Sequence, residues 1–221
     1  MIPETTGWCE FVEDSDEEES SIELFSPKDS QQHRHVPKDV LIAYNPLIGV
    51  QHIRYFAGPY KLEKDGSSVV IQINGACRGN GTQYARGSWG VFFGPESKYN
   101  KWGLLPPNAP QTTTFTEIYS LMIALEKIRD ELPFFPERVF IMSASPYLAT
   151  AFTPYMSIGW DQDGRINSRG RGVAHENFLL DIKQIIDDLA WSGDRKMEFK
   201  FWQVSRELIV DADALANRAF N

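Results

Sequence analysis

The chain has 221 residues, of which 42% are hydrophobic and 13% aromatic, and this length and composition suit one globular domain with a sizeable core better than two. No apolar run of about 18 residues occurs, and the first residues lack the basic and apolar blocks of a secretory signal, so we expect a soluble, intracellular protein without a membrane span. The formal net charge of -8 disfavours a polyanionic ligand only if the charge is evenly spread.

The charge is concentrated near the start of the chain. Residues 1–30 contain ten acidic residues and one lysine, whereas residues 31–221 contain 20 acidic and 21 basic residues. The block at residues 13–21 mixes like charges with serine and has no apolar periodicity, so we expect residues 1–36 to form a disordered acidic leader. Two roles remain open for it, a solubilising tail and a polyanion mimic that folds back on a nucleic-acid groove.

Alternating apolar residues predict the first ordered elements. Residues 37–65 contain two short apolar runs, and we expect an ordered extension packed on the main domain at residues 66–221. Strands are predicted at residues 68–73, at residues 88–93 and near residues 102–105, with glycine-rich turns between them. Three strands in close succession indicate an antiparallel meander.

The second half of the chain alternates helices and strands. Apolar residues at helical spacing from Ile118 to Ile128 predict a helix, and Thr114 and Glu117 at its start have the spacing of a capping box. The further predicted elements are a buried strand at 138–142, a short helix at 147–152, a helix at about 175–189, a strand at 197–202 and a helix at 211–219. The order is that of a mixed α/β domain.

The chain carries four short motifs, at residues 71–77, 112–117, 140–145 and 211–217. Taken in order, these motifs resemble the ribonuclease H family. In that family each stretch supplies one carboxylate to a site for two magnesium ions, which cuts the RNA strand of an RNA–DNA hybrid. The resemblance implies a ribonuclease H-like fold, with a mixed five-stranded sheet of three antiparallel strands followed by parallel additions, flanked by helices.

The resemblance places Asn74, Glu117, Ala144 and Asp213 at the four carboxylate positions. Glu117 and Asp213 keep an acid that could hold magnesium or manganese weakly, whereas Asn74 is a neutral amide and Ala144 offers no ligand. Each surviving acid could also be only a helix N-terminal residue. Because too few anions converge to neutralise two divalent ions, we expect hydrolysis to be absent or lower by several orders of magnitude.

The resemblance also implies contacts with nucleic acid. The turn near residue 79 matches the family's contact with the RNA strand, and the Arg/Gly loop at residues 164–173 resembles the loop that grips DNA phosphates. Asp161 and Asp163 precede this loop and could replace a missing ligand, although a solvated loop is the simpler explanation. The implied nucleic-acid-binding residues are Arg78, Asn80, Thr113, Thr114, Arg165, Asn167, Arg169 and Arg171.

These observations favour a catalytically impaired or inactive pseudoenzyme that still binds RNA–DNA hybrid or another nucleic acid. Three alternatives stay open: an active magnesium-dependent hybrid ribonuclease with a reduced ligand set, a protein-binding scaffold without nucleic acid, and a site inactivated deliberately at Asn74 or Ala144. The implied cofactor is magnesium or manganese if the site is active, and none otherwise.

Overall fold

The computed structural model describes residues 22–151, 175–192 and 195–221. The strands are β1 (Glu23–Leu24), β2 (Ile42–Asn45), β3 (Val50–Gly58), β4 (Lys61–Lys64), β5 (Ser68–Arg78), β6 (Arg86–Phe92), β7 (Lys101–Leu104), β8 (Arg138–Ser143), β9 (Trp191–Ser192), β10 (Arg195–Lys196) and β11 (Glu198–Gln203). The helices are α1 (Thr113–Glu131), α2 (Pro146–Ala151), α4 (Glu176–Ala190) and α5 (Val210–Arg218), and the 3-10 turn η1 covers Arg206–Leu208.

The central strand of the sheet is β5. Residues 68–75 are buried without interruption, as is typical of a strand that is covered on both faces. The first half of β5 pairs in parallel with β8, from Ser68 opposite Arg138 to Gln72 opposite Met142. Its second half pairs with β6 in antiparallel register, and β6 pairs likewise with β7. The predicted antiparallel meander followed by parallel strands is therefore confirmed.

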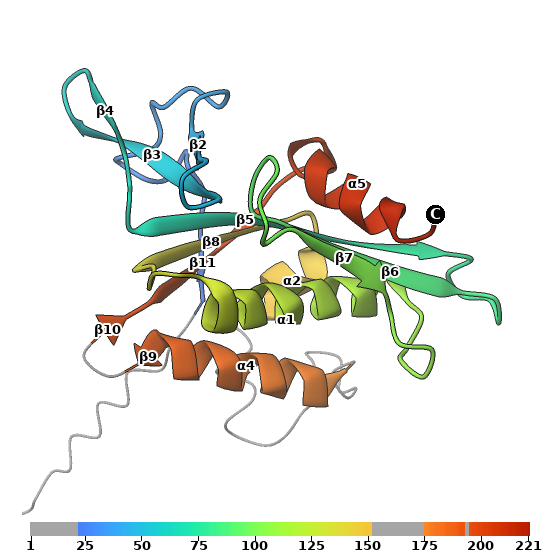
Figure 1. The fold of residues 1–221 in the computed structure, drawn as a ribbon. Coiled ribbons are helices and arrows are strands. Elements are labelled where there is room, and N and C mark those ends of the chain that lie inside the picture. Colours follow the sequence, from blue (N-terminus) through green and yellow to red (C-terminus); the bar gives the residue numbers. More distant parts are fainter. Residues whose placement is uncertain (1–21, 152–174, 193–194) are drawn as a thin grey trace, which may run out of the picture.

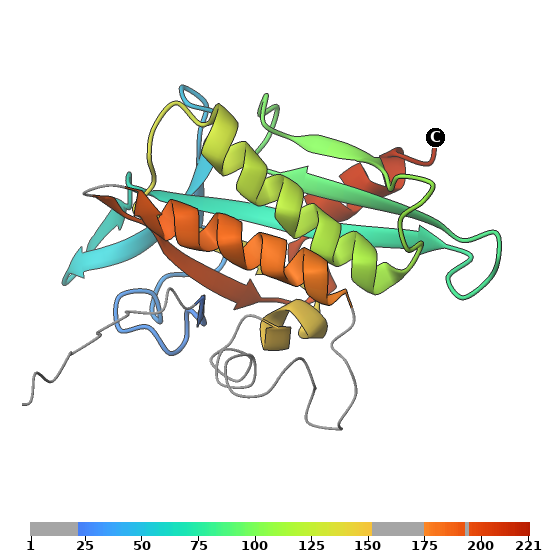
Figure 2. The ribbon, with the colours of Figure 1, turned by 90° about the horizontal axis from the view of Figure 1, so that it is seen from below.

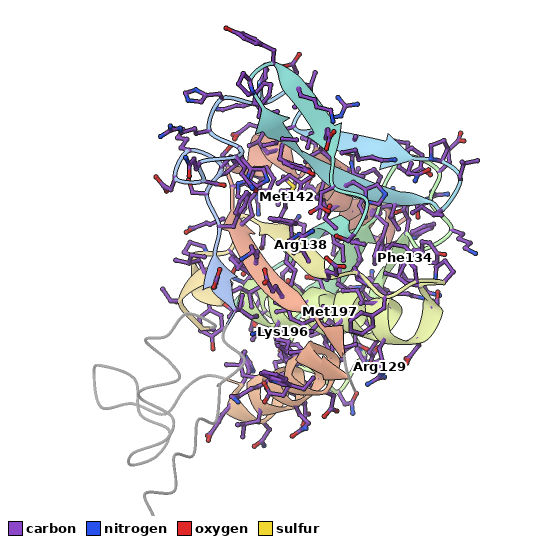
Figure 3. All side chains as sticks on the ribbon, turned by 90° about the vertical axis from the view of Figure 1, so that its left-hand side faces the viewer. Arg129, Phe134, Arg138, Met142, Lys196 and Met197 are labelled. Carbon is purple, nitrogen blue, oxygen red and sulfur yellow. The ribbon has the colours of Figure 1, made fainter. Side chains whose placement is uncertain are left out.

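Helices α1, α2 and α4 cover one face of the sheet, and α5 covers the other together with the N-terminal segment, residues 22–65 (Figure 1). Seen from below, α1 and α4 lie side by side across the first face (Figure 2). The apolar side chains form two clusters, one on each side of the sheet. Figure 3 shows Met142 toward the N-terminal segment and Met197 toward the helices. The sheet is thus the middle layer of three.

The sheet is larger than the five strands expected, because the N-terminal segment adds to it. Within the described ranges, nine strands belong to one sheet, and β1 to β4 supply the four extra strands. β3 pairs with β2, with β4 and, through Gln51 opposite Val70, with β5. The segment at residues 37–65 therefore lies against the main domain as part of its sheet.

Residues 22–36, which the composition assigned to a disordered leader, are ordered. β1 pairs in parallel with β11, and Ile22 is only 3% exposed. The Phe25 ring packs edge-on against Phe140 at 4.8 Å and against Trp202 at 5.4 Å between centroids. The average charge of residues 1–30 concealed these apolar contacts, so this part of the prediction was wrong. Residues 1–21 lie outside the described residues.

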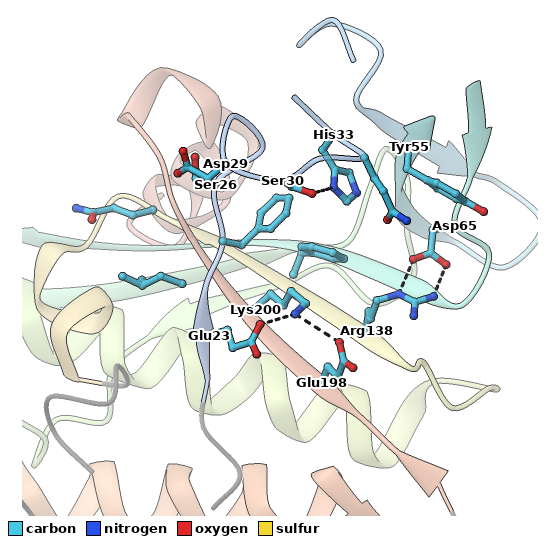
Figure 4. A pocket seen from close by; sticks show the side chains of 15 residues that line it. Glu23, Ser26, Asp29, Ser30, His33, Tyr55, Asp65, Arg138, Glu198 and Lys200 are labelled. Carbon is cyan, nitrogen blue, oxygen red and sulfur yellow. Dashed lines mark hydrogen bonds and ion pairs between the residues drawn. The ribbon is translucent and has the colours of Figure 1, made fainter. Parts of the chain in front are cut away.

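An ion pair joins the N-terminal segment to β8. Arg138 donates two hydrogen bonds to the Asp65 carboxylate, at 2.7 and 3.0 Å, beside an open cavity of about 840 Å³ (Figure 4). Burial opposes ionisation of Asp65, but hydrogen bonds from Arg138 and Ser67 outweigh it and hold the pKa of this carboxyl below its usual value. The segment is thus held by charge as well as by apolar contact.

Two glycines let the helices approach the sheet closely. A Cβ at Gly75 would overlap Thr116 of α1, and a Cβ at Gly90 would overlap the backbone of Ala212 and Ala216 in α5. The two helices therefore press on opposite faces of β5 and β6.

Across the described ranges, no helix is both long and apolar enough to cross a membrane.

We predict that Gly90→Ala lowers the free energy of unfolding by about 1–3 kcal/mol, because the added methyl group collides with helix backbone that cannot yield as a flexible side chain would. Urea denaturation measures the change. Gly66→Ala is the matched control, since nothing lies within 4 Å of a Cβ built there. Equal denaturation midpoints for the two variants would contradict the close packing of α5 on β6.

Candidate functional site

The four positions that the resemblance matches to carboxylates come from four elements. Asn74 lies in β5, Glu117 in α1, Ala144 directly after β8, and Asp213 in α5. Contacts join them in two pairs, Asn74 with Asp213 and Glu117 with Ser145, the residue after Ala144. The tight packing of Gly75 on Thr116 brings the chain neighbours of Asn74 and Glu117 into contact. The two pairs therefore belong to one region of the fold.

The first pair is an amide–carboxylate hydrogen bond. Asn74 is 3% exposed, and its Nδ2 donates to Oδ1 of Asp213 at 2.7 Å. Asn217, one turn further along α5, donates its amide to Oδ2 of Asp213 at 3.1 Å. Each carboxylate oxygen of Asp213 thus accepts an amide N–H, and hydrogen bonds to a charged acceptor are the stronger kind. This arrangement accommodates the negative charge of Asp213 without a cation.

A second, longer contact between β5 and α5 runs beside the first. Gln72 is buried, and its Nε2 donates to Oδ2 of Asp211 at 3.4 Å, while its Oε1 accepts from the backbone N–H of Ala212 at 3.5 Å. Residues two apart on a strand share a face, so Gln72 and Asn74 both point toward α5. The sequence analysis did not identify Gln72, although a second amide two residues before Asn74 was a usable signal.

Glu117 is not a helix cap. Helix α1 begins at Thr113 and its N-cap is Thr112, whose side chain accepts from the backbone N–H of Phe115 at 3.2 Å. The predicted capping box of Thr114 and Glu117 is therefore wrong, because the helix begins earlier and Glu117 lies in its second turn. Instead, the Ser145 hydroxyl donates to Oε2 of Glu117. A role as a helix N-terminal cap therefore does not explain Glu117.

The surroundings of Glu117 favour its neutral form. Burial raises the pKa of the Glu117 carboxyl above its usual value, against the opposing effects of the Ser145 hydrogen bond and the positive charge of Arg206. Arg206 lies in η1, just before α5. Neither Ser145 nor Arg206 was identified from the sequence, since both act through contacts between elements far apart in the chain.

These residues do not fit a pair of magnesium ions. Such a site needs several converging carboxylates, but Asn74 presents N–H to Asp213, and Ala144 is half-buried beside the cluster that contains Met142. Within the described part of the chain, no group of three or more His, Cys, Asp or Glu residues could hold a metal ion. Asp161 and Asp163 lie outside the described residues.

The described candidates for nucleic-acid contact lie at two places. Arg78 at the end of β5 is exposed, with its guanidinium 4.3 Å from the centroid of the Phe220 ring, and Asn80 lies in the exposed turn that follows. Thr113 and Thr114 form the start of α1 and are half-exposed. The remaining candidates, Arg165, Asn167, Arg169 and Arg171, lie outside the described residues.

We predict that Asn74→Asp lowers the free energy of unfolding by about 1–3 kcal/mol in the presence of a chelator, because a buried hydrogen bond is replaced by two facing carboxylates. Manganese should restore part of this loss in Asn74→Asp and leave the original chain unchanged. Thermal unfolding with and without manganese measures both effects. Asn108→Asp at an exposed position is the control, and an equal response of both variants would contradict the proposed role of the amide.

We predict that the stability advantage of Glu117→Gln grows as the pH rises from about 4 to about 8. The pKa of Glu117 is raised by folding, so its contribution to stability is fully present at low pH and is lost as the pH rises through the folded pKa. Glutamine stays neutral and can still accept from Ser145. Melting temperatures across this range test the prediction, with Glu126→Gln on the same helix as control. A constant difference from the original chain would contradict the raised pKa.

Comparisons with known proteins agree on one fold. No protein-family model matches the chain. It is 26% identical to ribonuclease H1 of Rattus norvegicus over 154 residues, which cover 66% of this chain and 52% of the rat protein, and 24% identical over 128 residues to ribonuclease H1 of Homo sapiens, covering 57% and 43%. The chain thus spans about half the length of the curated relatives it matches.

Solved structures show the same likeness. A foamy viral protease–reverse transcriptase in complex with RNA/DNA hybrid superposes with a TM-score of 0.50 and 17% identity, over 87% of this chain and 23% of the viral one. LC11-RNase H1 in complex with RNA/DNA hybrid gives a TM-score of 0.48 and 18% identity, over 68% and 94%. Taken with the antiparallel meander and the parallel strands, the likeness to the curated ribonucleases H1 and to the foamy viral structure shows that the chain contains a ribonuclease H-like domain.

Proposed function

We propose that this protein binds RNA–DNA hybrid without cutting it. The observation that carries the proposal is the hydrogen bond from the buried Asn74 amide to Asp213. An aspartate at position 74 would need a cation between it and Asp213, whereas the Asn74 amide donates a hydrogen bond directly to the Asp213 carboxylate. The chain is related to RNA–DNA hybrid nucleases by its ribonuclease H-like domain, and the proposal separates their two properties, binding and cutting.

The chemistry of hydrolysis is what the substitutions affect. A two-ion mechanism needs anionic oxygens that bridge the ions, to activate the attacking water and to stabilise the leaving oxygen. Asn74 and Ala144 together remove two negative charges from the aligned set, and Glu117 is shifted toward its neutral form by burial. This supports strongly reduced hydrolysis.

The chemistry of binding is affected much less. Residues 66–116, which carry the meander and the start of α1, contain one acidic residue, Glu96, against four basic ones. A surface with excess positive charge favours phosphate backbones independently of base sequence. Arg78 and Asn80 are exposed at the end of β5. The foamy viral structure of the same fold holds an RNA/DNA hybrid, which supports hybrid as the ligand to test first.

We predict no appreciable cleavage when the protein is incubated with a labelled RNA–DNA hybrid and magnesium or manganese, together with hybrid binding that weakens as salt rises. A gel assay for cleavage and fluorescence anisotropy for binding test both. Cleavage that Glu117→Gln abolishes would overturn the proposal in favour of an active enzyme with a reduced ligand set. No binding in low salt would favour a protein-binding scaffold.

The double reversion Asn74→Asp with Ala144→Asp is the positive control for the same experiment. It restores both missing carboxylates, and metal-dependent cleavage should then appear. Adding Glu117→Gln to the double reversion should remove that cleavage again. If the double reversion binds hybrid but stays inactive, the loss of carboxylates is not what separates binding from cutting.

A further inference from the structure

A stripe of arginine and aromatic side chains crosses the outer part of the sheet, on the side of α5. We call it the arginine–aromatic stripe. Its members are Arg78, Arg86, Trp102, Leu104, Arg218 and Phe220. They come from β5, β6, β7 and the end of α5, which lie together in Figure 1.

The strand registers place these side chains on one face. Trp102 of β7 pairs with Gly90, and Leu104 pairs with Ser88. Gly90 lies against α5, and the Ser88 hydroxyl donates to the Ala216 carbonyl in α5 at 2.7 Å. Paired residues share a face of the sheet, so both β7 side chains face the α5 side.

The arginines continue the same face. Arg86 lies two residues before Ser88 on β6, and it pairs with Arg78 on β5. Because side chains alternate along a strand, both arginines point to the side of α5. Arg78 is also four residues after Asn74, whose side chain reaches α5 as well. The stripe thus begins about 13 Å along β5 from Asn74.

Two of the arginines lie over aromatic rings. The Arg218 guanidinium is 4.4 Å from the centroid of the Trp102 ring, and that of Arg78 is 4.3 Å from the centroid of Phe220. Trp102 is still 37% exposed and Leu104 is 41% exposed. Flat cations held over rings leave a surface that is planar, positive and apolar at once.

The arginines of the stripe, Arg78, Arg86 and Arg218, form no ion pair among the described residues. The sequence has no Asp or Glu between Asp65 and Glu96. On a chain with a net charge of -8, these three exposed arginines form a separate positive surface.

We propose that the arginine–aromatic stripe binds single-stranded nucleic acid. The guanidinium groups would contact phosphates, and unpaired bases would stack on the exposed Trp102 and on the outer faces of Arg218 and Arg78. Stacking needs bases whose faces are free, which a duplex does not offer. An acidic peptide would satisfy the charge but would leave the planar surfaces unused. The proposal does not require that the protein bind hybrid.

The experiment measures the affinity of the full chain for a labelled single-stranded oligonucleotide and for an RNA–DNA hybrid, by fluorescence anisotropy at several salt concentrations. The stripe variants Trp102→Ala and Arg218→Ala should each weaken single-strand binding about tenfold. Arg218→Lys keeps the charge but not the planar cation, so it should lose a smaller part of the affinity. Hybrid binding should stay within about twofold for all three.

Lys101→Ala is the matched control. Lys101 lies beside Trp102 on the same strand, but it borders a cavity with Trp89, Ile123 and Lys127 on the α1 side of the sheet. This variant removes one positive charge without touching the stripe, so single-strand binding should change less than about twofold. Thermal unfolding of every variant shows whether the fold is kept.

The results that would overturn the stripe proposal differ from those that would overturn the proposed function. An equal loss for Lys101→Ala and Arg218→Ala would show charge attraction without a defined surface. Absence of single-strand binding in low salt would show that the stripe has a different partner. The same would follow if a glutamate-rich peptide bound more tightly than the oligonucleotide and alone displaced it from the stripe. If the original chain binds the single strand but not the hybrid, the proposed function is overturned and the stripe proposal stands.

Discussion

The buried hydrogen bond between the Asn74 amide and the Asp213 carboxylate is the contact on which the proposed loss of hydrolysis rests. It joins the central strand to the last helix across 139 positions of sequence, and with Asn217 it satisfies both oxygens of Asp213. A neutral donor on β5 is thus held against an anion on α5, so hydrogen bonds from the protein itself stabilise the charge of Asp213.

The scaffold around this bond is held by other contacts. Gly75 and Gly90 let α1 and α5 press on opposite faces of β5 and β6, which keeps Glu117 and Asp213 near the same end of the sheet. The buried run of β5 holds its place between β6 and β8. Because folding depends on these apolar and close backbone contacts, the polar residues of the site can change without loss of the architecture. Binding surfaces at the rim can persist in the same way.

The sequence predicts those parts of the structure that depend on local patterns. The helical spacing from Ile118 to Ile128 and the apolar run of β5 produce the expected elements. The start of α1 was misplaced, since three threonines in succession can each act as a cap and only the structure selects Thr112. The hydrogen bond of Glu117 with Ser145 and its electrostatic interaction with Arg206 were missed for another reason. They join residues that periodicity cannot relate, because each lies on a separate element.

The two hydrogen bonds accepted by the Asp213 carboxylate also have an evolutionary consequence. A lineage that had exchanged the partner of this acid for an amide would not regain a metal site by single steps. Asn74→Asp alone places two carboxylates together. Ala144→Asp alone adds one ligand without a second new anion that could help it hold a metal ion. We therefore expect each single reversion to be less stable or no better as a catalyst, and this epistasis would preserve the Asn74 amide.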